Sequence, residues 1–339
     1  MPVYLLCGVW ELNMTFKLGC GPMSVRINDI LARYARDRQK PLMIIASRNQ
    51  VDADSGYVMT TKQLAEQIAP LRSEYLWLCR DHCGPYFLDA EKGLPLRQVV
   101  EATKKTIAND IENGFDLIHI DTSRCESAGY RVADQLFGFC LKLNPNIKFE
   151  FGTEENVGTA ASIERYRTDV RFARQFPNMT FVVAQTGSLT MEDRQMGSFD
   201  VAMVQKLAQI ADVGRVKLKE HNADYLTAEQ IKLRPQAGVH ACNIAPQLGV
   251  YQTQVVLNLA KWKDVDTTAF RNLVLNGNKW AKWMLSDVDG VKTLVAGHYH
   301  FNSNEYRQLE AELSKHCDLD LEITNAITDC LDLYYTNLS

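Results

Sequence analysis

Apolar, strand-like runs alternate with amphipathic helical segments along most of this chain, and this alternation limits the folds that it can adopt. Eight such runs lie between about residues 15 and 260, and the spacing between them leaves room for one helix and two loops. Strands that alternate with helices form parallel sheets, because each helix carries the chain back to the same edge. Eight units in 339 residues predict an α/β protein of the (β/α)₈ TIM-barrel type.

The repeating pattern ends before the chain does, and this predicts a second structural part. We expect residues 1–263 to form the barrel and residues 264–339 to form a helical C-terminal extension that packs on it. Helical spacing of apolar residues recurs within this extension at about 305–315 and 320–334. No Pro- or Gly-rich linker separates the two parts, so the extension is not expected to be an independent domain.

Composition excludes several classes of protein. The chain has 37 basic and 41 acidic side chains and a formal net charge of −4, which gives no attraction for nucleic acid or an anionic membrane. No apolar run reaches the roughly 18 residues of a membrane span. The nine cysteines are odd in number and several lie in apolar runs, which favours reduced, buried thiols and a cytoplasmic location.

Polar residues follow the apolar runs, and in a parallel barrel the ends of successive strands meet at one mouth. Asp81-His82 follows the third run, Asp121 ends the fourth and His221 ends the seventh. Imidazole and carboxylate groups so placed suit a divalent ion, most simply Zn²⁺, with Mn²⁺ or Mg²⁺ as alternatives. We therefore expect a metal-dependent active site at the mouth.

Roles can be assigned to the residues at the strand ends. The predicted metal ligands are His82, Glu154 and His221. The predicted acid–base groups are Asp81, Asp121 and Glu220. The predicted substrate contacts are Ser47, Asn49, Gln50, Gln185, Lys219 and Asn243. His119 and His240 lie inside strands beside apolar residues, which favours a structural role for both.

Several common catalytic motifs do not occur in the sequence. It contains no GxGxxG after a strand, no GxxxxGK[ST] and no GxSxG. Enzymes that bind dinucleotides or nucleoside triphosphates through those loops are disfavoured, as are hydrolases with a nucleophile elbow.

The residues at the strand ends resemble a known family, the tagatose-bisphosphate aldolase subunits called GatZ and KbaZ. These are described as the non-catalytic partners of class II aldolases. The resemblance covers about residues 40–250. It is carried by Ser47-Arg48-Asn49-Gln50-Val51, Asp81-His82-Cys83-Gly84-Pro85, His119-Ile120-Asp121-Thr122-Ser123, Gly152-Thr153-Glu154, Gln185-Thr186-Gly187 and Glu220-His221-Asn222-Ala223-Asp224-Tyr225. It implies a TIM barrel, a ketose phosphate substrate and a partner aldolase subunit.

A more distant similarity, to the catalytic class II aldolases, implies an Asp-His pair at Asp81-His82 and acids at Asp121 and Glu154. Two positions depart from that pattern. Gln185 stands where those enzymes have a zinc-binding histidine, and Asn222-Ala223-Asp224-Tyr225 replaces their glycine-rich phosphate loop.

Three functions remain open at this point. The first is a metal-dependent enzyme that cleaves or epimerises a ketose or ketose phosphate by aldol-type chemistry. The second is a non-catalytic subunit that stabilises a partner class II aldolase, since a barrel can keep its shape without its chemistry. The third is a protein that binds or senses a sugar phosphate. A homo-oligomer is compatible with each of them.

Overall fold

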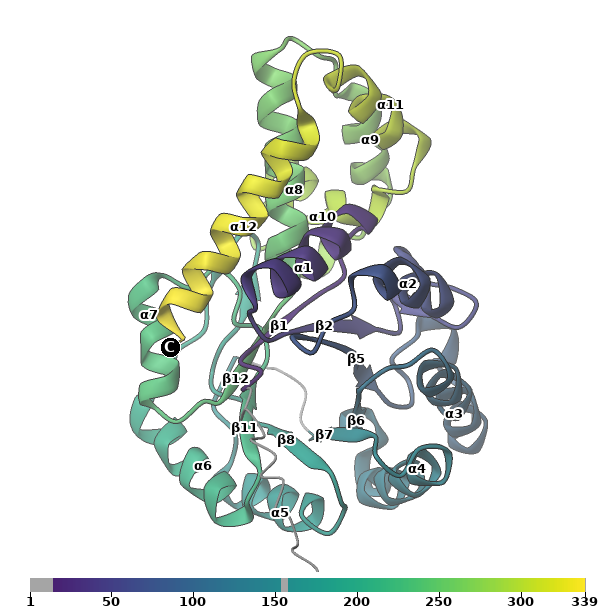
Figure 1. Ribbon diagram of the computed structural model, residues 1–339, viewed down its shortest axis with the longest axis vertical. Coiled ribbons are helices and arrows are strands. Elements are labelled where there is room, and N and C mark those ends of the chain that lie inside the picture. Colours follow the sequence, from purple (N-terminus) through teal and green to yellow (C-terminus); the bar gives the residue numbers. More distant parts are fainter. Residues whose placement is uncertain (1–14, 154–157, 339) are drawn as a thin grey trace, which may run out of the picture.

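Eight parallel strands close into a barrel in this computed structural model, which describes residues 15–153 and 158–338, and helices surround the barrel (Figure 1). The barrel strands are β1 (Leu18–Cys20), β2 (Leu42–Ser47), β5 (Leu76–Cys83), β6 (Leu117–Asp121), β7 (Lys148–Gly152), β8 (Met179–Val183), β11 (Lys217–Glu220) and β12 (Ala241–Ile244). They follow one another around the barrel in chain order, and β1 closes it by pairing with both β2 and β12. The predicted TIM barrel is confirmed.

Helices follow the strands as the alternation predicts. They are α1 (Val25–Arg38), α2 (Thr61–Ile68), α3 (Leu96–Glu112), α4 (Gly129–Leu143), α5 (Ile163–Ala173), α6 (Val201–Gly214), α7 (Ala228–Gln236) and α8 (Pro246–Trp262). Five of these helices (α1, α2, α5, α6 and α7) are capped by the residue just before their first turn: for example, the Ser24 hydroxyl accepts a hydrogen bond from the Ile27 N–H, and Thr60 forms a reciprocal capping box with Gln63. Local sequence therefore sets where these five helices begin.

The loops between the barrel strands and helices contain short strands and 3-10 turns. Two small ladders, β3 (Val51–Asp52) with β4 (Met59–Thr60) and β9 (Thr190–Met191) with β10 (Arg194–Gln195), follow β2 and β8. Single 3-10 turns span Ala69–Leu71, Asp89–Glu91, Ser123–Ala128, Ala281–Trp283 and Gly297–His300.

The C-terminal segment is helical, as expected. It contains α9 (Thr268–Asn276), α10 (Asp289–Ala296), α11 (Asn304–Leu313) and α12 (Leu319–Asn337). In Figure 1 α9 and α11 stand away from the barrel, whereas α12 runs back to it and ends beside α7. Tyr34 of α1 donates a hydrogen bond to Asp332 (2.7 Å), and Tyr335 donates one to the carbonyl of Pro41 (2.6 Å). The boundary between residues 263 and 264 stays a prediction.

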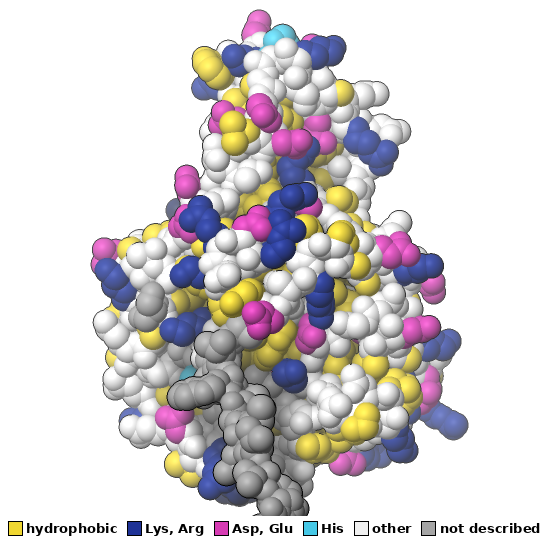
Figure 2. Space-filling view, viewed as in Figure 1, with side chains coloured by type: hydrophobic (Ala, Val, Ile, Leu, Met, Phe, Trp, Pro, Cys, Tyr) yellow, Lys and Arg dark blue, Asp and Glu magenta, His cyan; other side chains and the backbone are white. Residues whose placement is uncertain are grey.

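The surface is consistent with a balanced charge. Basic and acidic side chains are interspersed over the face shown in Figure 2. Within residues 15–153 and 158–338, no helix combines the length and the apolar character that a membrane crossing requires. The cysteines of the same residues are all free thiols.

An apolar layer fills the barrel beneath its polar mouth. Its members are Phe16, Met43, Ile45, Cys79, Leu117, Phe181 and Ala241. Successive strand residues point to opposite faces, so the residue two positions further along faces the interior again. Ser47, Asp81, His119 and Asn243 each lie two residues beyond a member of this layer. The strand register therefore places polar side chains directly above an apolar floor.

Arg80, between Cys79 and Asp81 on β5, faces outward and anchors the strand. Its guanidinium is fully buried and makes paired hydrogen bonds to both carboxylate oxygens of Asp110 on α3 (2.7 and 2.6 Å). It also donates to the carbonyl oxygens of Ala46 and Val51 (2.9 and 2.5 Å). This one side chain joins β5, α3 and the loop after β2.

Removing Arg80 should destabilise the whole barrel. Arg80→Ala leaves the Asp110 carboxylate buried without its partner, and we expect a loss of about 3–5 kcal/mol in the free energy of unfolding. Urea unfolding followed by circular dichroism measures it. The matched control is Arg33→Ala, which removes an exposed ion pair with Asp29 on α1 and should cost much less. Equal losses for the two variants would contradict this assignment.

Candidate metal centre

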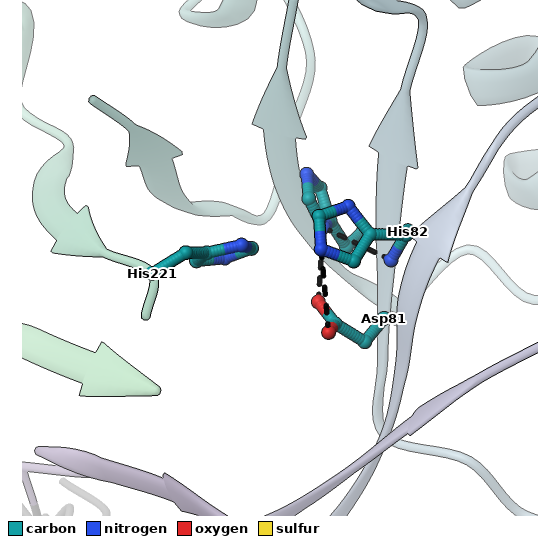
Figure 3. Close-up of side chains that lie close together, drawn as sticks. Asp81, His82 and His221 are labelled. Carbon is teal, nitrogen blue, oxygen red and sulfur yellow. Dashed lines mark hydrogen bonds and ion pairs between the residues drawn. The ribbon is translucent and has the colours of Figure 1, made fainter. Parts of the chain in front are cut away.

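Three imidazoles and one carboxylate converge at the mouth of the barrel. Asp81 and His82 end β5, His119 lies on β6, and His221 directly follows β11. One ligand atom from each lies within 4.8 Å of the corresponding atoms of the other three. Figure 3 shows Asp81, His82 and His221 facing a common space. Segments far apart in the chain thus build a single cluster.

The spacing of the imidazoles fits one metal ion. The ring centroids are 5.0 Å apart for His82 and His221, 5.3 Å for His82 and His119, and 5.2 Å for His119 and His221. Zinc–nitrogen bonds of about 2.1 Å in a tetrahedral site place imidazole centroids about 5 Å apart. Imidazole suits zinc and other transition metals, and the adjacent carboxylate also suits Mn²⁺. The donor set is therefore compatible with a divalent ion without identifying it.

An irregularity in β5 lets two adjacent residues face the same site. Asp81 and His82 would point to opposite faces of a regular strand. Here the pairing of β5 with β6 shifts register between Arg80 and Cys83, and His82 adopts a left-handed φ of 45°. Such a bulge re-aims a side chain next to a functional site.

Gly84 is needed just beyond this bulge. A Cβ atom at this position would lie 1.6 Å from the carbonyl oxygen of Asp121. The backbone of the loop after β5 therefore passes directly against the end of β6. This close approach explains the glycine that follows Asp81-His82-Cys83 in the sequence.

His82 is held by carboxylates on two sides. Its Nδ1 atom lies 2.6 Å from Asp121 Oδ2, and its Nε2 atom lies 3.7 Å from Asp81 Oδ2. Phe87 stacks on the ring with 5.4 Å between centroids. Burial lowers the pKa of His82, but the negative charge of Asp81 and the hydrogen bond to Asp121 outweigh burial and raise the pKa to about 9. Because Asp121 takes Nδ1, the Nε2 atom is the one left for a metal.

His221 is held by a carboxylate from within the barrel. Its Nε2 atom lies 2.8 Å from Glu150 Oε1, and Lys219 Nζ lies 2.5 Å from the other oxygen of Glu150. Glu150 and Lys219 are 1% and 0% exposed. Although burial opposes it, the charge of Lys219, with His119 and His221, lowers the pKa of Glu150 to about 2. Burial lowers the pKa of His221, which favours the neutral, ligating form of the ring.

Asp81 lies between the histidines as an ionised carboxylate. Its Oδ1 atom is 3.2 Å from His119 Nδ1. Burial alone would raise the pKa of Asp81, but the charge of His82 and the hydrogen bond from His119, with the charge of His221, lower it well below the ordinary value. A carboxylate in this state can ligate a metal or accept a proton from a bound substrate.

The other predicted acids are distributed differently. Asp121 joins the cluster through His82 and also accepts a hydrogen bond from the Ser123 N–H (3.0 Å). Glu220 points out of the barrel, away from the histidines. There it pairs with Arg234 of α7 (3.1 Å) and accepts a hydrogen bond from the Thr186 hydroxyl (2.7 Å). Its catalytic role stays a prediction that no contact with the histidines supports. Glu154, the third predicted metal ligand, lies outside the described residues.

Most predicted substrate contacts lie near the mouth but are engaged within the protein. Ser47 donates through its hydroxyl and its N–H to the side-chain oxygen of Gln50 (both 2.9 Å), and Asn49 donates to the carbonyl of Phe87 (3.1 Å). Gln185 is buried where β8 ends. These residues order the loops, and their contact with a substrate stays a prediction.

Two of the predicted contacts differ sharply in what they offer a ligand. Lys219, two residues before His221, forms a buried ion pair with Glu150. Asn243 is buried on β12 and neither its amide nitrogen nor its amide oxygen has a hydrogen-bond partner. A buried amide left without partners is costly unless a ligand satisfies it, so Asn243 is the stronger candidate for substrate contact.

His119 and Glu150 are the site residues that sequence reasoning missed. Both lie inside strands between apolar neighbours, and this context suggested a structural role for His119. The available signal was the two-residue alternation: His119 is two residues before Asp121, and Glu150 is two residues before Gly152, so both face the barrel interior.

These features define a TIM barrel with a histidine–carboxylate cluster at its mouth, and solved structures share the fold. A probable tagatose 6 phosphate kinase from Sinorhizobium meliloti 1021 matches with a TM-score of 0.81 at 17% identity, covering 95% of this chain and 100% of that one. A fructose-bisphosphate aldolase from Campylobacter jejuni matches at 0.55, with 12% identity and coverages of 92% and 90%. The YdjI aldolase from Escherichia coli K12 matches at 0.52, with 10% identity and coverages of 88% and 91%.

A family model gives the finer relationship. The model described as D-tagatose-1,6-bisphosphate aldolase subunit GatZ/KbaZ-like matches residues 20–137. This segment includes Asp81, His82, His119 and Asp121, and it ends before Glu150 and His221. The resemblance inferred from the strand-end residues is thereby confirmed.

The metal assignment is tested by removing the imidazoles one at a time. We expect wild-type protein to retain one divalent ion per chain after dialysis, and His82→Ala, His119→Ala and His221→Ala each to lose it, as measured by elemental analysis. His240→Ala is the control, because this half-exposed residue lies near Asp212, just before β12 begins. Metal retained by all three variants would exclude this site.

The role of Glu150 can be tested separately from ligation. Glu150→Gln removes the charge that orients His221 but keeps the shape, so metal affinity should fall about 10–100-fold. Competition with a chromophoric chelator measures the dissociation constant. Glu220→Gln is the matched control, since Glu220 precedes His221 yet pairs with Arg234 instead. Equal affinities for Glu150→Gln and wild type, with both folded, would contradict the role of Glu150.

Proposed function

We propose that this protein is a metal-dependent enzyme of carbohydrate metabolism that acts on a ketose or ketose phosphate by aldol-type cleavage or epimerisation. The observation that carries the proposal is the cluster of His82, His119 and His221 around the ionised carboxylate of Asp81. The family model, whose description is that of a tagatose-bisphosphate aldolase subunit, supports the substrate class. The TIM barrel, with its site at the carboxyl ends of the strands, supports the location.

A divalent ion at the three imidazoles would polarise the ketose carbonyl and stabilise the negative charge that develops on it. The residues of the chain supply the rest. Asp121 and Glu150 fix the orientation of His82 and His221. The amide of Asn243 offers N–H donors and an acceptor oxygen to a sugar hydroxyl.

Asp81 is the candidate base. It would accept the proton of the C4 hydroxyl as the C3–C4 bond breaks, and it would return that proton when the bond forms again. Rejoining on the opposite face would invert C4. Cleavage and epimerisation share these first steps and differ afterwards. In epimerisation C3 of the enediolate attacks the aldehyde again, whereas in cleavage C3 takes up a proton, which protonated Asp81 could supply, and the fragments leave.

The second candidate function is a non-catalytic subunit that stabilises a partner class II aldolase, which the description of the family model favours. The cluster counts against it, because a scaffold gains nothing from holding three imidazoles and a carboxylate together. Co-purification with an aldolase and no turnover alone would favour this alternative. A homo-oligomer and a cytoplasmic location remain predictions under either function, and a sugar-phosphate sensor is the third reading.

Asp81→Asn tests the enzymatic proposal. It keeps the shape of the side chain and removes the base, so turnover of the best ketose substrate should fall about 10²–10⁴-fold. The assay uses purified protein loaded with Zn²⁺, Mn²⁺ or Mg²⁺, and metal content is measured alongside to separate loss of the base from loss of the ion. Asp212→Asn, far from the cluster on α6, is the control.

Undiminished turnover by metal-loaded Asp81→Asn would rule out Asp81 as the base. Absence of turnover by wild type with every ketose and metal tried, together with co-purification of an aldolase, would replace the proposal by the subunit alternative.

A further inference from the structure

The usual phosphate position of a TIM barrel is filled in this protein by one of its own carboxylates. TIM barrels frequently bind a substrate phosphate with the loops after strands seven and eight and the N-terminus of a nearby helix. Free backbone N–H groups and the helix dipole attract the anion there. The corresponding elements are the loop of residues 222–225 after β11 and the N-terminus of α8 after β12.

Asp224 occupies the N-terminus of α8. Its Oδ1 atom accepts hydrogen bonds from the Ala245 N–H (2.9 Å) and the Gln247 N–H (3.0 Å). The residue is 1% exposed, and burial raises the pKa of its carboxyl group to about 7 in spite of these two donors. An arriving phosphate would have to displace a buried side chain that already satisfies the helix.

In the loop of residues 222–225 after β11, two backbone N–H groups are also engaged within the protein. The Ala223 N–H donates to the carbonyl of Asn243 (2.9 Å), and the Tyr225 N–H donates to the side-chain oxygen of Gln247 (2.8 Å). Gln195 covers the loop by donating to the carbonyls of Asn222 and Asp224 (2.9 and 3.2 Å). Through these contacts the loop of residues 222–225 binds other parts of the protein instead of presenting these groups to an anion.

Tyr334 of α12 closes the same region from the other side. Its hydroxyl lies 3.1 Å from the side-chain oxygen of Gln247 and also hydrogen-bonds to the carbonyl of Ala223. The C-terminal extension thus helps to hold the loop and the start of α8 in their closed arrangement.

The buried cations around the carboxyl ends of the strands are neutralised as well. Arg48 pairs with Glu91 (2.7 Å), Lys219 with Glu150 (2.5 Å) and Arg234 with Glu220 (3.1 Å). None of these three is available to a phosphate without breaking a buried ion pair, which is costly. In contrast, the buried polar groups without a hydrogen-bond partner at this end of the barrel, among the described residues, include neutral ones: the amide of Asn243 and the hydroxyls of Thr122 and Tyr225. An amide donates and accepts at once, which matches a hydroxyl and not a dianion.

We propose that the substrate of this site is an unphosphorylated ketose, recognised by neutral hydrogen-bonding groups where TIM barrels frequently bind a phosphate. This rests on the proposed function and narrows its substrate class. Asp224 is the residue that disfavours a phosphorylated sugar, because its carboxylate already accepts the backbone hydrogen bonds that a phosphate would need.

The test compares matched substrates on metal-loaded, full-length protein. D-tagatose is paired with D-tagatose 6-phosphate and D-tagatose 1,6-bisphosphate, and D-fructose with its corresponding phosphates. We expect kcat/KM to be at least about tenfold higher for the free sugar of a pair, which corresponds to about 1.4 kcal/mol. A tenfold preference for the phosphorylated member would overturn the inference and leave the proposed function standing.

If no sugar is turned over, that result counts against the proposed enzymatic function. A second measurement then tests the exclusion of phosphate separately. Inorganic phosphate is titrated into wild-type protein while the amide resonances of Ala245 and Gln247 are followed by NMR. We expect no saturable shift of either resonance, which would support exclusion of phosphate from this position. A saturable shift of both would show that phosphate displaces Asp224, and would overturn the inference whatever the enzyme assays give.

Discussion

The buried contact of Glu150 with Lys219 and His221 is the interaction on which the site depends. A carboxylate inside a barrel is costly unless opposite charge and hydrogen bonds compensate for its lost hydration. Lys219 supplies the charge at 2.5 Å, and His221 takes the remaining oxygen at 2.8 Å. The apolar floor of the barrel and the histidine cluster are thereby joined by one charged layer. His221 cannot change its orientation without leaving Glu150 incompletely paired.

The same logic extends to the other side of the mouth. The bulge in β5 turns His82 toward the cluster, and Asp121 on the neighbouring strand fixes its ring. Arg80, pointing outward from the same strand, ties this bulged segment to α3 and to the loop after β2. The geometry of the cluster is therefore set mainly by strands and buried pairs, which is the arrangement that precise positioning requires.

The fold followed from the sequence because its signal is periodic. Each of the eight predicted runs overlaps a barrel strand, and the caps at Ser24 and Thr60 begin α1 and α2 through local sequence. The convergence of Asp81, His82, Asp121 and His221 followed from the same periodicity, since strand ends of a parallel barrel share one rim. The position of these residues at the ends of successive strands was sufficient to predict that they lie close together.

The remaining assignments depended on side-chain direction. Glu220 and His221 are neighbours in sequence, yet alternation sends one to Arg234 and the other to the cluster. His119 and Glu150 lie within strands, where an apolar context masked their inward direction. The bulge that keeps both Asp81 and His82 in the site is a tertiary feature with no periodic signature. Likewise, the hydrogen bonds from the N-terminus of α8 to the Asp224 carboxylate join segments that are separated in the chain, and nothing in the sequence pattern marks them.

We propose that three imidazoles hold one divalent ion above the barrel floor. The decisive measurement is anomalous diffraction from crystals grown with Mn²⁺ or Zn²⁺. We expect one strong peak at bonding distance from His82, His119 and His221, about 2.0–2.3 Å from an imidazole nitrogen of each. A peak bound elsewhere, or these three rings well ordered with no anomalous density between them, would contradict it.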